Sequence, residues 1–154
     1  MGEEREGPGQ PRATQILVAE HDRGERELFA WAIRGTGLRV VEIETAAQLE
    51  DRLASGAFDA VIVGHLGASR AARSALDVVR RCSASVRGKV ILIVNDNERM
   101  SPVGLAAVLR KPVDIEVLRE RVRSLAWEAH SDRLRSNGAR VPAPGSDDES
   151  PPAG

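Results

Sequence analysis

The sequence contains a single cysteine, and this scarcity excludes two classes of small protein. Cys82 has no second cysteine in the chain, so neither a disulfide framework nor a zinc site of paired cysteines can form within it. A lone thiol is typical of a reducing compartment. We therefore expect a cytoplasmic protein.

An excess of charge of one sign is absent too. The chain holds 22 Lys and Arg against 23 Asp and Glu, a formal net charge of -1, so no overall field attracts nucleic acid or an anionic membrane. No run approaches the roughly 20 apolar residues that span a bilayer, and the first residues lack the apolar core of a signal peptide. We expect neither nucleic acid nor membrane as a partner.

Two terminal segments hold little that can be buried. Residues 1–12 are rich in Glu, Gly and Pro, and residues 137–154 are dominated by Pro, Gly, Ser and acidic residues. We expect both segments to be disordered tails. The hydrophobic content of 42% is enough for one core, which we place in a single domain over residues 13–136.

Five short apolar runs alternate with helical patterns along this domain. The predicted strands are residues 16–19, 38–43, 60–63, 90–94 and 106–109. The predicted helices lie between Asp22 and Gly35, after the capping box that begins at Thr45, over residues 69–82, and over residues 114–135. Continuously apolar strands indicate burial on both faces. The pattern predicts an α/β fold with a doubly wound, five-stranded parallel sheet, whose ligands would sit at the carboxyl ends of the strands.

The residues at those strand ends carry a resemblance to a known family. The segments ILVAEHD, FDAVIVG and GLAAVLRKP stand in the order and approximate spacing of the CheY-like receiver domain of response regulators, over roughly residues 14–126. The most specific element is Gly104, followed seven residues later by Lys111 and Pro112. The resemblance implies the strand order 2-1-3-4-5 and a cis peptide bond before Pro112.

The site that the resemblance implies is degenerate. In that family an acidic pair and an aspartate bind Mg²⁺, a histidine kinase supplies the phosphoryl group to the aspartate, and a lysine contacts it. Carried over by position, Glu20 and His21 fall on the acidic pair, Gly64 on the phosphoacceptor and Lys111 on the lysine. Glycine has no side chain to phosphorylate, and an imidazole is a poor Mg²⁺ ligand. We therefore expect a pseudo-receiver with no cofactor and no enzymatic activity.

The segment before Lys111 is shorter than the resemblance requires. Val94 and Gly104 are closer in sequence than their counterparts in the family, by more than one helical turn. The intervening residues include Pro102 and many polar side chains, which favour a loop. We expect the fourth helix of the family to be shortened or missing.

Several site residues have two readings. Glu20 and Lys111 either form a structural ion pair across the strand ends or contact a ligand, and Asp22 reads better as a helix cap than as a metal ligand. No metal is expected, but an alternative is a transition-metal or small-anion site built from Glu20, His21, His65 and Asp96.

Two tryptophans and a leucine are candidate partner-binding residues. Trp127 falls opposite the core seam of the last helix, with Leu134 on the same face, so an exposed interaction stripe is one reading. The other reading is that Trp127 folds back over the edge of the core. For Trp31 we expect partly buried packing first and partner contact second.

These residues favour a phosphorylation-independent interaction module of bacterial signal transduction. Residues 138–154 are too short and polar for a DNA-binding module, so we expect the effect to pass through a histidine kinase, a regulator or a second copy in a homodimer. One alternative is a metal or anion sensor that uses Glu20, His21 and His65. A small enzyme is less favoured, because no nucleophile and base pair is visible.

Overall fold

The computed structural model describes residues 14–67, 73–136 and 138. The strands are β1 (Gln15–Ala19), β2 (Arg39–Ile43), β3 (Ala60–Val63), β4 (Val90–Val94) and β5 (Ala107–Arg110). The helices are α1 (Arg23–Arg34), α2 (Ala46–Ser55), α3 (Arg73–Arg80), α4 (Ala84–Arg87) and α5 (Ile115–Ser136). Each predicted strand is present within one residue of its expected bounds. The tails predicted for residues 1–12 and 137–154 lie, apart from Gly138, outside the described residues.

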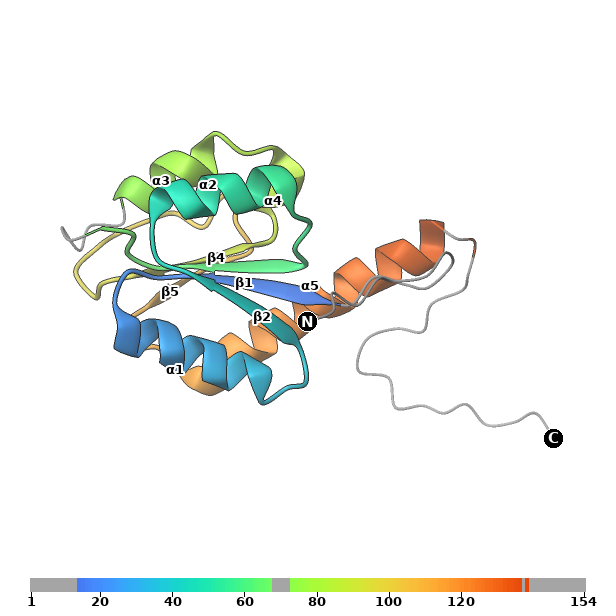
Figure 1. The fold of residues 1–154 in the computed structure, drawn as a ribbon, viewed down its shortest axis with the longest axis horizontal. Helices are drawn as coiled ribbons and strands as arrows, with labels where there is room; N and C mark the ends of the chain where they lie inside the picture. The colour runs from blue at the N-terminus through green and yellow to red at the C-terminus, as the bar shows by residue number, and fades with distance from the viewer. Residues whose placement is uncertain (1–13, 68–72, 137, 139–154) are drawn as a thin grey trace, which may run out of the picture.

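The five strands form one all-parallel sheet in the order β2-β1-β3-β4-β5, which confirms the predicted fold and strand order. Helices α1 and α5 cover one face, and α2, α3 and α4 cover the other (Figure 1). Side chains of alternate strand residues point to opposite faces of the sheet and pack in two separate core clusters. Ile16, Val18 and Ile62 pack toward α1 and α5, whereas Leu17 and Val61 pack toward α2 and α3.

Local sequence signals explain where the first two helices begin. The Asp22 carboxylate accepts a hydrogen bond from the Glu25 amide at 2.9 Å and caps α1, as predicted. Thr45 and Gln48 form a reciprocal capping box at the start of α2, also as predicted. Both caps lie at the same edge of the sheet as the carboxyl ends of the strands.

The region from α3 to β5 departs most from a regular alternation of strands and helices. Helix α3 runs from Arg73 to Arg80, and the residues 69–72 that were also predicted as helix lie outside the described residues. A one-turn helix, α4, which the sequence patterns missed, precedes β4. Residues 95–106 connect β4 to β5 without any helix, so the expected loss of the fourth helix of the family is confirmed.

Helix α5 runs antiparallel to the strands and extends beyond the sheet (Figure 1). Its 22 residues correspond to about 33 Å of helix. The apolar spacing predicts a seam of Ile115, Leu118, Val122 and Leu125, of which the last three are buried and Ile115 is half-buried. Neither this helix nor any other in the described part of the chain combines the length and the apolar character needed to cross a membrane.

One predicted core residue is wrong. Leu28, Phe29, Ala32 and Ile33 stand at a helical spacing that predicts one buried stripe on α1, but Leu28 is 46% exposed whereas the other three are buried. Leu28 falls at the margin of the stripe, where the helix surface turns away from the sheet. The apolar face of α1 is therefore narrower than the sequence suggests.

Candidate functional site

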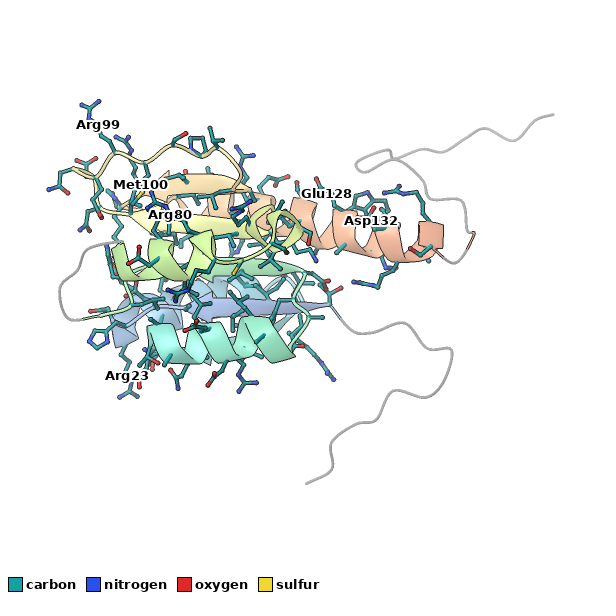
Figure 2. All side chains as sticks on the ribbon, turned by 90° about the horizontal axis from the view of Figure 1, so that it is seen from above. Arg23, Arg80, Arg99, Met100, Glu128 and Asp132 are labelled. Carbon is teal, nitrogen blue, oxygen red and sulfur yellow. The ribbon has the colours of Figure 1, made fainter. Side chains whose placement is uncertain are left out.

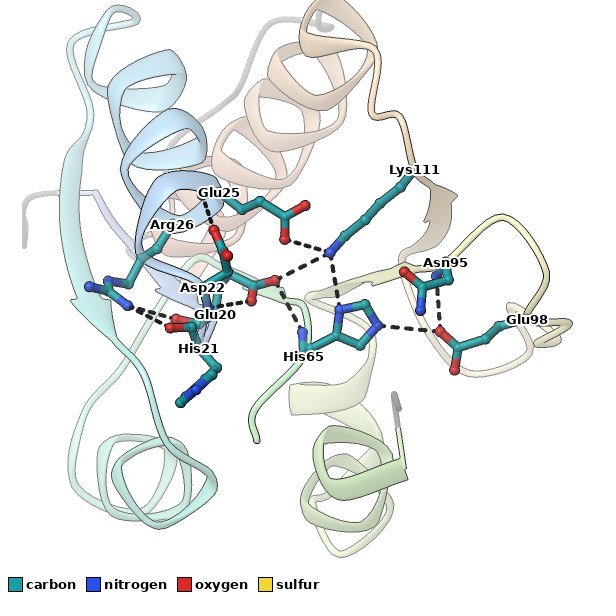
Figure 3. A network of polar contacts seen from close by, with 9 residues as sticks. All are labelled: Glu20, His21, Asp22, Glu25, Arg26, His65, Asn95, Glu98 and Lys111. Carbon is teal, nitrogen blue, oxygen red and sulfur yellow. Dashed lines mark hydrogen bonds and ion pairs between the residues drawn. The ribbon is translucent and has the colours of Figure 1, made fainter. Parts of the chain in front are cut away.

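The strand ends form a polar crevice at the carboxyl edge of the sheet. The register places Ala19 of β1 beside Val63 of β3, so the chain leaves both strands at the same level. The crevice has a volume of about 620 Å³. Its lining residues come from the ends of four strands and the start of α1: Glu20, His21, Asp22, Glu25, His65, Gly67, Asn95 and Lys111. Figure 3 shows most of them from close by.

Glu20 is the most deeply placed of these side chains. It is only 1% exposed, and its two carboxylate oxygens accept hydrogen bonds from two backbone amides, that of Asp22 at 2.8 Å and that of His65 at 3.1 Å (Figure 3). Lys111 Nζ lies 3.8 Å from the same carboxylate. A buried carboxylate needs such donors, because its desolvation is otherwise costly. Glu20 is thus held in one orientation, folded across the end of β3.

This orientation leaves no room for a side chain at Gly64. A Cβ atom added there would lie 3.1 Å from Cδ of Glu20 and closer than 3.0 Å to its Oε1, a separation that real Cβ atoms essentially never show. The Glu20 carboxylate cannot move aside cheaply, since it is buried and bonded to two amides. The carboxylate of Glu20 therefore occupies the space beside the position that the resemblance assigns to the phosphoacceptor.

Lys111 supplies the positive charge of the crevice. Its ammonium donates to Glu25 Oε2 at 2.5 Å and to His65 Nδ1 at 3.0 Å (Figure 3). The sequence interpretation of a structural ion pair with Glu20 is therefore incomplete, because the shorter contact is made to Glu25. The peptide bond between Lys111 and Pro112 is cis, in the place where the resemblance puts it.

His65 bridges Lys111 and the loop after β4. An ammonium group has only donors, so His65 Nδ1 accepts the bond from Lys111 and the ring hydrogen is on Nε2. Nε2 then donates to Glu98 Oε1 at 3.3 Å, and the same oxygen accepts from the Asn95 amide at 2.9 Å. The buried imidazole thereby ties β3, β5 and the segment 95–106 together.

His21 does not take part in this network through its side chain. The side chain is exposed at the rim of the crevice, whereas its backbone amide donates to the His65 carbonyl at 2.6 Å. Arg26 braces the same turn by donating to the Glu20 carbonyl at 2.9 Å and the His21 carbonyl at 3.3 Å. The turn after β1 is therefore fixed by backbone contacts.

The residues of the crevice do not fit the Mg²⁺ site of the resemblance. Glu20 already uses both oxygens for backbone amides, the second position of the acidic pair is an exposed imidazole, and Gly64 offers no ligand. Mg²⁺ requires several hard oxygen ligands in near-octahedral geometry. The crevice therefore supports no catalytic step through this ion.

The structure brings together two of the four residues of the alternative metal set, Glu20 and His65. Among the described residues, the ligand atoms that lie within 4.8 Å of one another belong to Glu20, Glu25 and His65. His21 faces the rim, and Asp96 is exposed and outside the lining of the crevice. The Lys111 ammonium contacts all three clustered residues, so a cation already stands among them.

Sequence reasoning missed Glu25 and Glu98. The position of Glu25 could have been predicted, because it lies in the first turn after the cap Asp22, and that turn starts at the carboxyl edge of the sheet. The position of Glu98 could not, since it belongs to the irregular segment 95–106, whose path does not follow from periodicity. At the opposite end of β3, Asp59 pairs with Arg133 at 2.8 Å and accepts a hydrogen bond from the Gln15 amide.

The three partner-binding candidates differ in how far they are exposed. Trp127 is half-buried, with its ring centroid 6.1 Å from that of His130, and it lines a small groove with Leu38. Of the two interpretations of Trp127, the one in which it covers the edge of the core is therefore favoured. Leu134 is also half-buried. Trp31 was expected to be partly buried, but it is 64% exposed, with the Arg119 guanidinium 5.6 Å from its ring.

The similarity to known proteins lies in structure. No protein-family model matches the sequence, and no curated protein matches it either. The receiver domain of Francisella response regulator 1452 has a TM-score of 0.63 and 16% identity, over 75% of this chain and 98% of that one. A CheY-like response regulator receiver domain protein from Methanospirillum hungatei has a TM-score of 0.65 and 16% identity, over 79% and 99%.

A third structure extends the same likeness. The signal receiver domain of an HD domain-containing protein from Pseudomonas fluorescens has a TM-score of 0.62 and 19% identity, over 78% of this chain and 99% of that one. These structures are covered almost end to end. The chain has the fold of the receiver domains of response regulators.

Proposed function

We propose that this chain is a phosphorylation-independent receiver-like module that acts in signal transduction by binding other proteins. The observation that carries the proposal is the placement of the Glu20 carboxylate across Gly64, where a phosphoacceptor side chain would be. The lysine that would contact a phosphoryl group is instead bonded to Glu25 and His65. The crevice is thus stabilised by its own charges and is assigned no catalytic step.

Acetyl phosphate with Mg²⁺ provides the direct test. We expect no phosphoryl adduct in the intact mass, and no amide chemical-shift changes around Glu20 when Mg²⁺ is added. A phosphorylatable receiver domain treated in parallel confirms that the reagent is active. A stoichiometric phosphoryl adduct on this chain would refute the proposal.

The partners that the proposal implies are proteins. Receiver folds in two-component systems meet histidine kinases and regulators, and a second copy of this chain is the third possibility. Size-exclusion chromatography with light scattering separates self-association from the other two. Trp31 is the best of the sequence candidates for such contacts, because a 64% exposed tryptophan has the character of an interface hot spot.

Metal sensing is the second candidate function for the crevice. The clustering of Glu20, Glu25 and His65 favours it, since one imidazole and two carboxylates are a donor set that suits zinc. The ammonium of Lys111 opposes it, because a second cation would have to displace the first. We expect Zn²⁺ to leave the melting temperature of the wild type unchanged and to raise that of Lys111→Met. A Zn²⁺-dependent rise in the wild type would favour the sensor.

A further inference from the structure

The missing helix between β4 and β5 leaves an open groove beside α3. This α3 groove has a volume of about 400 Å³ and lies between α3 and the segment 95–106. Its apolar lining consists of Leu76, Val79, Met100, Val103 and Leu105. Figure 2 looks down on this face and places Arg80 of α3 beside Met100. The groove is separate from the polar crevice, with which it shares no lining residue.

The apolar surface of the groove is only partly covered by the chain. Val103 is 86% exposed, the largest exposed fraction among the large hydrophobic residues of the described chain. Met100, Leu105 and Val108 are half-buried and pack on the core cluster of this face. An exposed apolar patch of this kind, flanked by charge, is typical of a protein-binding surface.

The charged residues of the groove are all basic. Arg80 and Arg87 line it, and none of its described lining residues is acidic. Neither arginine forms an ion pair with another described residue, whereas neighbouring Arg81 is paired with Glu50. The Nε atom of Arg87 is buried without a hydrogen-bond acceptor among the described residues. Two guanidinium groups without a carboxylate partner among the described residues, beside an apolar floor, fit an acidic ligand.

The layer structure indicates what shape the ligand has. Helices cover both faces of the sheet elsewhere, and on this face α2 and α3 stand side by side over β1 and β3. The segment 95–106, which connects β4 to β5, adds no helix to this layer. A helix about 10 Å wide packed at the usual spacing from α3 would complete the layer. An amphipathic helix inserts its apolar residues into such a groove at spacings of three and four.

We propose that the α3 groove binds an amphipathic helix of a partner protein, in which the apolar anchor residues are flanked by aspartate or glutamate. The anchors contact Leu76, Val79 and Leu105, and the acidic residues pair with Arg80 and Arg87. The inference rests on the proposed function as a protein-binding module and adds the surface and the chemical character of the partner.

A displayed library of helical peptides with randomised surface residues tests the proposal with the full chain as the target. We expect selected peptides to carry an apolar stripe flanked by acidic residues. Fluorescence anisotropy on these peptides should show a loss of affinity of about tenfold or more in Arg80→Glu and in Val103→Asp. The matched control is Arg23→Glu, an exposed arginine that Figure 2 places far from Arg80, and we expect it to stay within about twofold.

Other outcomes place a different occupant in the groove and overturn the proposal. Enrichment of basic or neutral helices would contradict the acidic character proposed for the partner. Peptides that bind the wild type and both groove variants with equal affinity would show that the binding site is not the α3 groove. Self-association that Val103→Asp abolishes assigns the groove to a second copy. A tenfold gain in peptide affinity on removal of residues 139–154 assigns it to the chain's own acidic segment.

The failure of this inference is distinguishable from failure of the proposed function. Peptides that bind at another surface would refute the groove as the binding site, but the proposed function as a protein-binding module would stand. A phosphoryl adduct formed with acetyl phosphate would refute the phosphorylation-independent function, but binding of a helix in the α3 groove would remain possible. Urea unfolding of both groove variants shows that a lost affinity is not lost folding, since Arg80 and Val103 are exposed.

Discussion

The polar crevice and the α3 groove both lie where this chain departs from the pattern that the resemblance implies, but their charged side chains differ in whether they are paired. In the crevice, the Lys111 ammonium contacts two carboxylates and an imidazole, and Glu20 accepts bonds from two amides. In the groove, Arg80 and Arg87 have no ion pair with any described residue, beside an apolar side chain that is 86% exposed. The charges of the crevice are thus neutralised by the chain's own side chains, whereas the groove keeps basic side chains without an ion pair to any described residue and apolar surface that the described residues leave exposed.

The contrast between crevice and groove makes stability the quantity to measure. Substitutions in the crevice should lower the free energy of unfolding, because each leaves a buried polar group without its partner. Substitutions in the groove should lower affinity for a partner and leave the fold unchanged. The expected losses of stability therefore descend from the crevice to the groove.

The largest effect is expected for Gly64→Asp, which restores the residue type that the resemblance places there. The new side chain must displace the Glu20 carboxylate from its two amide donors, so we expect a loss of about 3 kcal/mol in the free energy of unfolding. Urea denaturation followed by circular dichroism measures it. The matched control is Gly67→Asp in the same crevice, where an added Cβ meets no atom of the described residues within 4 Å, and we expect a change within about 0.5 kcal/mol.

A double-mutant cycle separates the clash from a general intolerance at Gly64. In a Glu20→Ala background the space beside Gly64 is free, so Gly64→Asp should cost about 2 kcal/mol less than in the wild type. An undiminished cost would mean that Glu20 does not fill the space, and the crevice would no longer differ from the groove in this respect.

The second largest effect is expected for Lys111→Met, which keeps most of the side-chain length and removes the charge. Glu20 and Glu25 would then face each other without a cation in a largely buried site. Removal of one partner of a fully buried pair costs about 3–5 kcal/mol, and we expect about 2 kcal/mol here because Lys111 keeps 18% of its side chain exposed. The control is Lys89→Met, since Lys89 has no ion pair with a described residue. Equal losses at the two lysines would contradict the idea of a self-neutralised crevice.

How far the sequence predicted this crevice depends on the kind of element that carries each residue. Each of Glu20, Gly64 and Lys111 directly follows a strand. The apolar pattern predicts the strands, and the parallel topology places their carboxyl ends at one edge of the sheet. Glu25 was predictable in principle from the cap at Asp22. Glu98 was not, because its position depends on the path of a loop.

Side-chain direction is the second part that the sequence could not supply. That Glu20 folds across Gly64 follows from two amide donors whose positions require the folded backbone. The exposure of Trp31 was misjudged and the burial of Trp127 was left open, because a helical wheel gives the angle of a side chain but not the width of the surface packed against it. The strands were predictable because continuous apolar runs have few other outcomes in an α/β chain.

An intermediate effect is expected for His65→Phe. The substitution keeps a buried ring and removes the bonds to Lys111 and Glu98, so we expect a loss of about 1 kcal/mol. His21→Phe is the control, since that side chain is exposed at the rim of the same crevice, and it should change stability by less than about 0.5 kcal/mol. Long-range ¹H–¹⁵N correlation spectra of the wild type should show the ring hydrogen of His65 on Nε2. A hydrogen on Nδ1 would exclude the bond from Lys111 and break the chain of contacts.

The smallest effect is expected for Val103→Ser in the α3 groove. Its side chain is 86% exposed in the folded chain, so the substitution removes little buried area, and the free energy of unfolding should change by less than about 0.5 kcal/mol. Val94→Ser, at a fully buried valine of β4, is the contrasting control and should cost about 2 kcal/mol. Urea denaturation measures both. A loss above about 1 kcal/mol for Val103→Ser would mean that the groove, like the crevice, is filled by the chain itself, and the two regions would then differ only in chemistry and not in availability to a partner.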